Sequence, residues 1–152
     1  MALKGKLSTE IPIKAPASKW FHLFATKLYH VQNLAERLHH TKLHEGEDWH
    51  HKDTIKQWTY EIDGKVLTCK EKIEAVDEEN KTITYILFGG DISPHYKVFK
   101  FIFHVIEKED GSAYVNWTLE YEKIDHSVEH PYGYVEYLTK SSEDVDANLL
   151  KA

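Results

Sequence analysis

Apolar and polar residues alternate in five successive segments of this chain, and short polar turns separate the segments. The segments are 54–62, 67–75, 82–88, 96–106 and 113–124. Because successive side chains of a β-strand point to opposite faces, a period of two predicts strands that are buried on one face. Asp63-Gly64 and Asp110-Gly111 are typical hairpin turns. Strands joined by such short turns pair in antiparallel fashion, so this part of the chain predicts an antiparallel sheet.

The residues outside these segments predict two further strands and three helices. We expect strands over 3–13 and, with a weaker pattern, over 39–45. A short helix begins near Pro16, which suits a first helical turn, and a second covers about 26–34. The last helix is expected over 131–150. Its apolar stripe consists of Tyr134, Leu138, Val145 and Leu149, interrupted by Ser141 and Ser142. This order predicts an α+β domain in which a curved sheet folds around one long helix.

Glu71 occupies a position at which the alternation predicts a buried side chain. Leu67, Cys69, Ile73 and Ala75 share its face of the strand. A buried, unpaired carboxylate is costly, so such a group usually has a partner, becomes protonated or borders a cavity. Two interpretations follow. In the first, Glu71 has a purely structural role, because a tyrosine or lysine pairs with it or because the strand is exposed at this point. In the second, Glu71 is a polar group inside a ligand pocket.

Further polar residues fall on inward faces of the predicted elements. They are Tyr60, Tyr85, Tyr121 and Ser141. In a sealed core each of these groups needs a hydrogen-bond partner. A ligand site, in contrast, is mostly apolar and carries a few placed polar groups. The pattern fits such a pocket, and it fits a core of internally paired tyrosines equally well.

The composition is that of a globular domain, which we place at residues 1–152 because of the chain's length. The formal net charge is −6 and no basic stripe is present, which argues against nucleic-acid binding. The single cysteine, Cys69, allows no internal disulfide and favours a reducing compartment. We see no secretory signal and no apolar run long enough for a bilayer. The expected location is therefore the cytoplasm, without membrane attachment.

No motif for a metal or cofactor is evident. Five histidines gather in one region: His39, His40, His44, His50 and His51. Zinc sites need three or four converging ligands with closed spacing, so we interpret these histidines as solvated residues near a loop. Cys69 is interpreted as a small buried residue, because no histidine is placed with it by sequence. Ser141-Ser142 lacks the glycine context of a hydrolase nucleophile. We expect no metal and no cofactor.

Several short motifs, taken together and in order, identify a family. They are Leu43-His44-Glu45-Gly46 before Asp48-Trp49, the run IKQWTY at 55–60, Asp63-Gly64-Lys65, Lys70-Glu71-Lys72, Gly90-Asp91 before Tyr96-Lys97, the run WTLEYEK at 117–123, and Val145-Asp146-Ala147. Nearly end to end, the chain resembles the plant major latex proteins, within the birch-pollen-allergen (pathogenesis-related class 10) and START-like superfamily. The resemblance implies a helix-grip fold. In this fold a seven-stranded curved antiparallel sheet surrounds a long C-terminal helix, two short helices close one end, and the interior encloses a large hydrophobic cavity.

The resemblance also implies which side chains face that cavity. The implied ligand-binding residues are Lys56, Trp58, Tyr60, Cys69, Ile83, Phe99, Phe101, Phe103, Val115, Trp117, Leu119, Tyr121, Tyr134, Leu138, Ser141 and Val145, together with Glu71 and Tyr85. The sequence departs from the family pattern at Asp53, where a glycine is usual, and at Thr139 and Ser141, where apolar residues are usual. If Ser141 faces the pocket, the cavity is more polar than usual and suits an oxygenated ligand.

Three functions fit these observations. The first is binding of an apolar small plant metabolite, such as a terpenoid, steroid, flavonoid or alkaloid, in defence or specialised metabolism. The alternative is a cofactor-free cyclase or isomerase, for example of a reactive iridoid or other terpenoid intermediate. In that case a desolvated Glu71 is the general acid or base, and Tyr85 hydrogen-bonds the substrate or Glu71. The third is a pure interaction protein whose cavity has no role. We expect a monomer or weak dimer.

Overall fold

Hydrogen bonds join seven strands into one antiparallel sheet in the computed structural model, which describes residues 3–151. The strands are β1 (Lys4–Ile13), β2 (Leu38–Glu45), β3 (Ile55–Ile62), β4 (Lys65–Asp77), β5 (Thr82–Phe88), β6 (Tyr96–Glu107) and β7 (Ala113–Lys123). Their order in the sheet is β1-β7-β6-β5-β4-β3-β2. Strands β2 to β7 are thus neighbours in sequence order, and β1 returns to pair with β7.

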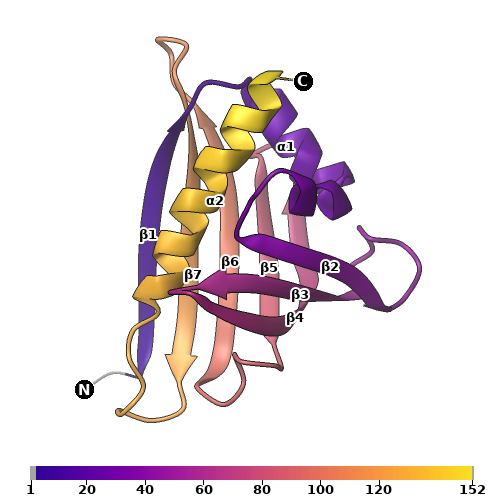
Figure 1. Ribbon diagram of the computed structural model, residues 1–152. Helices are drawn as coiled ribbons and strands as arrows, with labels where there is room; N and C mark the ends of the chain where they lie inside the picture. The colour runs from indigo at the N-terminus through magenta and orange to yellow at the C-terminus, as the bar shows by residue number, and fades with distance from the viewer. Residues whose placement is uncertain (1–2, 152) are drawn as a thin grey trace.

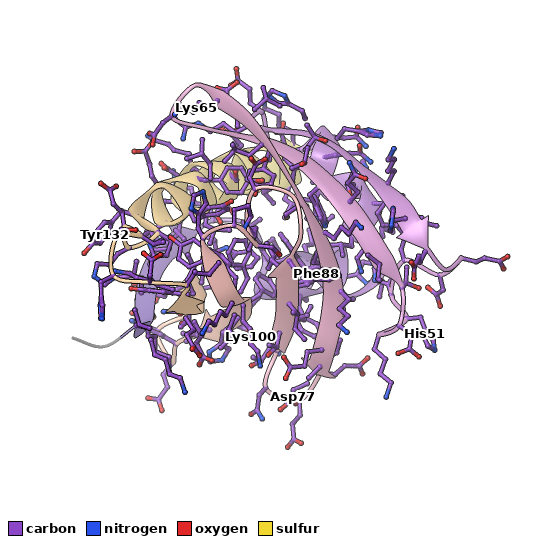
Figure 2. All side chains as sticks on the ribbon, turned by 90° about the horizontal axis from the view of Figure 1, so that it is seen from below. His51, Lys65, Asp77, Phe88, Lys100 and Tyr132 are labelled. Carbon is purple, nitrogen blue, oxygen red and sulfur yellow. The ribbon has the colours of Figure 1, made fainter. Side chains whose placement is uncertain are left out.

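The sheet is strongly curved, and the long helix α2 (Tyr132–Lys151) lies against its concave side. In Figure 1, β1, β7 and β6 run behind the helix, whereas β2, β3 and β4 run across the direction of those strands. Seen from below, the strands bend around the interior (Figure 2). The pairing of β4 with β5 is irregular between Ile73 and Ala75, and such bulges increase the bend of a strand.

Two short helices, α1 (Ala17–Thr26) and the 3-10 helix η1 (Leu28–Asn33), lie at the upper end of the sheet in Figure 1. Trp20 and Phe24 lie one turn apart on α1, and their rings are stacked. The Phe24 ring lies 4.5 Å from that of Phe103, which in turn lies 5.0 Å from the Trp117 ring. Aromatic packing of this kind joins α1 to β6 and β7 and forms the centre of the core.

Asp146 fastens the second half of α2 to the corner between β1 and α1. Its carboxylate accepts hydrogen bonds from Lys14 N at 2.8 Å, Ala15 N at 2.9 Å and Trp20 Nε1 at 3.0 Å. Hydrogen bonds to an ionised acceptor are stronger than neutral ones. This buried aspartate satisfies backbone groups that would lack partners as the chain leaves the strand.

The predicted fold class and the order of elements are confirmed. The predicted second helix over 26–34 corresponds to η1, and the weakly patterned strand over 39–45 corresponds to β2. The inward position of Glu71 is also confirmed, since it is 3% exposed. The buried position predicted for Ala75 is wrong, because the β4 bulge shifts the alternation after Ile73 and leaves Ala75 exposed. No helix within residues 3–151 is long and apolar enough to cross a bilayer.

Candidate functional site

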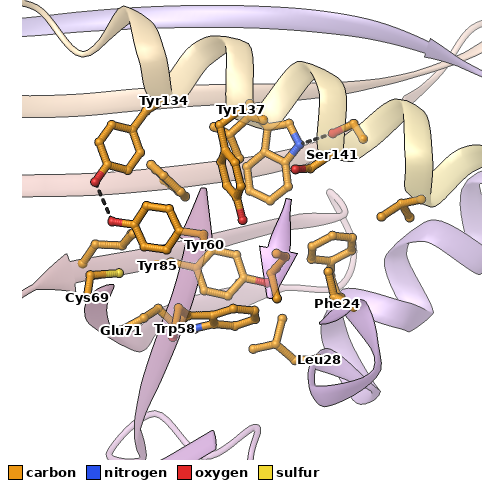
Figure 3. Close-up of a pocket in the computed structure, with 18 residues that line it drawn as sticks. Phe24, Leu28, Trp58, Tyr60, Cys69, Glu71, Tyr85, Tyr134, Tyr137 and Ser141 are labelled. Atoms are coloured by element: carbon orange, nitrogen blue, oxygen red, sulfur yellow. Dashed lines mark hydrogen bonds between the residues drawn. The ribbon is translucent and has the colours of Figure 1, made fainter. Parts of the chain in front are cut away.

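An apolar cavity lies between the sheet and α2, and α1 and η1 close one side of it (Figure 3). Its volume is about 90 Å³. The lining residues come from nine of the ten elements: Phe24, Leu28, Val31, Leu38, Trp58, Tyr60, Cys69, Glu71, Tyr85, Leu87, Phe101, Trp117, Tyr134, Tyr137, Leu138, Ser141, Ser142 and Val145. Most of these side chains are apolar or aromatic, which is typical of sites for small molecules.

The cavity is smaller than the large one that the sequence resemblance implies. Small-molecule sites usually measure roughly 300–1,000 Å³. Here Tyr60, Tyr85, Trp117, Tyr134 and Tyr137 extend into the interior from the sheet and the helix and fill part of it. A ligand of terpenoid or flavonoid size therefore needs some of these rings to move.

Glu71 is the charged group of the cavity wall. The Lys56 ammonium lies 3.1 Å from Glu71 Oε2, and the Trp58 indole N–H donates a hydrogen bond of 3.0 Å to Oε1. Burial raises the pKa of Glu71 to about 6, and Lys56 and Trp58 only partly oppose this rise. Both interpretations of Glu71 therefore hold in part: it has structural partners, and it also lines the cavity.

Lys56 connects Glu71 to the loop between β2 and β3. Its side chain is fully buried, and its Nζ donates a hydrogen bond of 3.1 Å to Trp49 O in that loop. The Trp49 ring packs on Tyr29 of η1. The loop, the buried ion pair and the cavity wall thus form one continuous network.

Several polar groups of the wall are paired with one another. The Tyr60 and Tyr134 hydroxyls lie 2.5 Å apart and join the sheet to α2, and the Trp117 indole N–H donates to Ser142 Oγ at 2.9 Å (Figure 3). Burial raises the pKa of the Cys69 thiol to about 12, so this side chain stays a neutral thiol near neutral pH.

Two hydroxyls of the wall are not regularly paired within the fold, although Ser141 lies close enough to the Tyr137 phenol to oppose the rise of its pKa. Tyr85 OH and Ser141 Oγ are buried and make no hydrogen bond of normal geometry with any group in residues 3–151. Burial and the nearby Glu71 carboxylate raise the pKa of Tyr85 well above its usual range, so the phenol keeps its proton.

The comparisons with known proteins agree with this geometry. The model of the pathogenesis-related protein Bet v 1 family matches residues 2–152. The chain belongs to the Bet v 1 family. This family is known for binding hydrophobic ligands.

Similar members of the Bet v 1 family include MLP-like proteins of Arabidopsis thaliana. MLP-like protein 43 is 40% identical over 151 residues, which cover 98% of this chain and 95% of that protein. MLP-like protein 31 is 39% identical over 98% of this chain and 88% of that protein. Among solved structures, the ginseng major latex-like protein 151 from Panax ginseng superposes with a TM-score of 0.92 at 32% identity, over 98% of this chain and 99% of that one.

Most of the predicted site residues line the cavity of this Bet v 1 fold. They are Trp58, Tyr60, Cys69, Glu71, Tyr85, Phe101, Trp117, Tyr134, Leu138, Ser141 and Val145. The prediction needs correction for seven residues that are buried elsewhere in the core: Lys56, Ile83, Phe99, Phe103, Val115, Leu119 and Tyr121. Their faces were predicted correctly, but neighbouring side chains separate them from the cavity. Phe103 is covered by Phe24, for example, and Tyr121 OH bonds His130 Nδ1.

Sequence reasoning missed seven lining residues, which are Phe24, Leu28, Val31, Leu38, Leu87, Tyr137 and Ser142. A signal existed for three of them. Leu87 shares the strand face of Tyr85, and Tyr137 and Ser142 adjoin predicted residues on α2. The other four reach the cavity through the packing of α1, η1 and the start of β2 against α2, which a local pattern does not specify.

The histidine-rich region does not assemble a metal site. Within residues 3–151, no group of three or more His, Cys, Asp or Glu side chains is placed to hold a metal ion. His39 pairs with Glu61 on the surface. His50 is half-buried, and its ring lies near the Thr26 backbone without a hydrogen bond of regular geometry. Burial and the nearby Lys56 lower the pKa of His50, which keeps it neutral near pH 7.

Proposed function

We propose that this protein binds a small apolar plant metabolite, of the terpenoid, steroid, flavonoid or alkaloid type, in the cavity between the sheet and α2. The observation that carries the proposal is the nearly continuous apolar and aromatic wall of that cavity. Removing apolar ligand surface from water contributes about 25 cal/mol per Å² before the costs of association. Membership of the Bet v 1 family supports the same role. A place in defence or specialised metabolism, in the cytoplasm, is part of the proposal.

Tryptophan emission tests ligand binding directly, because Trp58 and Trp117 are part of the cavity wall. Terpenoids, flavonoids and a fluorescent apolar probe are titrated, and we expect saturable changes for at least one class. Val145→Phe fills the cavity from α2 and should abolish the response. Leu150→Phe is the matched control, since Leu150 is 50% exposed on the same helix. An absent response in the parent protein, or equal binding by both variants, contradicts the proposal.

The surface favours a monomer or a weak dimer. The large apolar side chains that are exposed within residues 3–151 are Tyr29, Val66, Val76, Val98, Ile124, Tyr132 and Leu150. They are scattered over η1, β4, β6, α2 and a loop, whereas stable interfaces gather such residues in one patch. Sedimentation equilibrium at micromolar concentration tests this expectation.

A second candidate function is catalysis of a cofactor-free cyclisation or isomerisation, for example of an iridoid or other terpenoid intermediate. The observation that favours it is the position of Glu71 and Tyr85 in one apolar wall. With its pKa near 6, the Glu71 carboxylate can take a proton beside a substrate carbonyl and return it to another atom. The Tyr85 phenol meanwhile donates a hydrogen bond to the carbonyl oxygen. General acid–base help of this kind is worth about 10²–10⁴-fold in rate.

The catalytic candidate is tested by measuring rates and product ratios with Glu71→Gln and Tyr85→Phe. We expect kcat to rise as the pH increases through about 6 in the parent protein, because the base is the ionised carboxylate. Unchanged rate and stereochemistry in both variants remove these residues from the mechanism and leave the binding role in place.

A further inference from the structure

The polar groups of the cavity wall divide into two sets. One set is satisfied within the protein: the Tyr60–Tyr134 hydroxyl pair, the Trp117–Ser142 bond and the Trp58–Glu71 bond. The other set consists of Tyr85 OH, which has no hydrogen-bond partner among residues 3–151, and Ser141 Oγ, whose one polar neighbour is the Tyr137 phenol at a geometry short of a regular hydrogen bond. Glu71 Oε2 belongs to neither set, because it faces the Lys56 ammonium at 3.1 Å. Buried polar groups in folded proteins are nearly always paired, so an unpaired group in a cavity wall calls for an explanation.

Ser141 is exceptional for a hydroxyl residue inside a helix. Such side chains usually turn back to the carbonyl of the preceding turn, as Thr139 does with a bond of 2.9 Å to Val135 O. Ser141 makes no such bond, although it is only 9% exposed. Its oxygen interacts with the Tyr137 phenol one turn earlier on α2, and both residues line the cavity.

Tyr85 approaches the cavity from the opposite side. It lies on β5 opposite Ile73, and Glu71 lies opposite Leu87, so Tyr85 and Glu71 are diagonal neighbours on one face of the sheet. Figure 3 shows Tyr85 on the side of the sheet, and Tyr137 and Ser141 on the side of the helix. An occupant of the cavity lies between these hydroxyls. Because the Tyr85 phenol keeps its proton, it can donate a hydrogen bond to an oxygen of the ligand.

We infer that the ligand is an oxygenated apolar molecule with two separate oxygen groups, a carbonyl that accepts a hydrogen bond from Tyr85 and a second carbonyl or hydroxyl that bonds Ser141. This inference rests on the proposed binding function and narrows its ligand class. Hydrocarbons leave the Tyr85 phenol unpaired, and singly oxygenated compounds bond only one of the two sites. A site with unpaired buried polar groups discriminates against ligands that cannot pair them.

Three probes with one carbon skeleton test the inference: limonene without oxygen, carvone with a carbonyl, and carvone hydrate with a carbonyl and a hydroxyl. A purely apolar cavity binds limonene most tightly, because each added oxygen favours water. We expect the reverse order, with a gain of about fivefold to tenfold in affinity for each oxygen group, the equivalent of one hydrogen bond. Dissociation constants are measured by calorimetry or tryptophan emission.

Two variants test which residue causes each gain in affinity. Tyr85→Phe should remove the preference for carvone over limonene, and Ser141→Ala should remove the preference for carvone hydrate over carvone. Tyr96→Phe is the control, since Tyr96 OH bonds Glu129 O outside the cavity. If limonene binds most tightly, or if the preferences survive both variants, the inference is overturned while the binding function stands. If none of the three probes binds, the inference fails, and the wider titration of terpenoids, flavonoids and the fluorescent probe decides whether the binding function fails as well.

A measurement without ligand keeps the test independent of the probes. Because Tyr85 OH has no hydrogen-bond partner in the fold, Tyr85→Phe should leave the melting temperature of the free protein unchanged or higher. Tyr60→Phe, which breaks the bond to Tyr134, should lower it. A clear loss of stability in Tyr85→Phe would show that its hydroxyl serves the fold, and it would overturn the inference.

Discussion

Lys56 and Glu71 face each other on neighbouring strands and form a buried ion pair, with 3.1 Å between Nζ and Oε2. Lys56 is fully buried and Glu71 is 3% exposed. Two charges without water attract each other strongly, but each has lost its hydration. Replacing either residue alone leaves the other charge buried without its partner and should therefore lower the stability of the fold.

Lys56→Met should destabilise the fold by about 3–5 kcal/mol, because it leaves the Glu71 carboxylate buried without its cation. The double variant Lys56→Met/Glu71→Gln should cost less than the sum of its single variants. Urea unfolding of all three measures this coupling. The control is Lys6→Met, which removes an exposed pair with Glu120 and should cost less than about 1 kcal/mol. Equal losses for the two lysine variants would contradict the buried-pair interpretation.

Glu71 should also make stability depend on pH. The fold raises its pKa from 4.5 to about 6, so the folded protein holds this proton more tightly than the unfolded chain. The contribution of Glu71 to the free energy of unfolding therefore falls as the pH rises from about 4.5 to 6, by about 2 kcal/mol in total. Above pH 6 it is constant.

The measurement for this pH effect is urea unfolding of the parent and Glu71→Gln between pH 4 and pH 8. Other carboxyl groups oppose the trend, because Asp77, Asp110 and Asp125 have lowered pKa values. They are common to both proteins, so the difference between the two curves isolates Glu71. If the difference in free energy of unfolding between the two proteins does not vary with pH, Glu71 has the same pKa in the folded and the unfolded state.

Asp146→Ala should cost about 3–5 kcal/mol of folding stability. The change leaves Lys14 N, Ala15 N and Trp20 Nε1 without their acceptor, and hydrogen bonds to charged groups contribute about 1.5–3 kcal/mol each. Asp144→Ala is the matched control on the same helix, because Asp144 accepts one exposed bond from Glu36 N. It should cost less than about 1 kcal/mol. Thermal unfolding measures the loss of stability in each variant, and similar losses in the two would contradict the role assigned to Asp146.

Gly90→Ala should destabilise the fold far more than Gly64→Ala. Both glycines have positive φ angles, 49° and 77°, which cost an L-residue about 1 kcal/mol. A β-carbon on Gly90 would also lie 2.2 Å from Thr68 O, whereas one on Gly64 would meet nothing within 4 Å. We expect about 1 kcal/mol for Gly64→Ala and at least about 3 kcal/mol for Gly90→Ala. Chemical denaturation tests the ranking, which equal losses would refute.

The sheet was predictable because its strands carry a regular period of two. The inward position of Glu71 followed from that period alone. The prediction failed at Ala75, where a bulge changes the alternation. Bulges arise from the fit of one strand to its neighbour, and the sequence of a single strand contains little information about that fit.

The cavity was less predictable than the sheet. Alternation identifies which face of a strand is inward, and Phe99 and Val115 are indeed buried. Whether an inward side chain meets empty space depends on what packs against it from α1, η1 and α2. Tyr85 and Tyr121 illustrate the point: both were expected inside, yet Tyr121 bonds His130 and Tyr85 remains unpaired. The difference arises because the loop after β7 brings His130 against Tyr121, whereas no hydrogen-bond partner within residues 3–151 is brought against Tyr85, and the alternation within a strand specifies neither.

Asp146 has a mechanical consequence for α2. Hydrogen bonds to distant backbone atoms concentrate in the second half of the helix, through Asp144, Asp146 and Asn148. The first third is held by aromatic rings around Tyr134, by the Tyr60–Tyr134 hydrogen bond and by a surface ion pair between Arg37 and Glu136. An exposed ion pair and ring contacts rearrange more easily than the buried hydrogen bonds of Asp146, so we expect a ligand larger than 90 Å³ to gain room by displacing the first third of the helix. We expect backbone amides near Tyr137 to exchange with deuterium faster than those near Asp146, and bound guest to reduce that contrast.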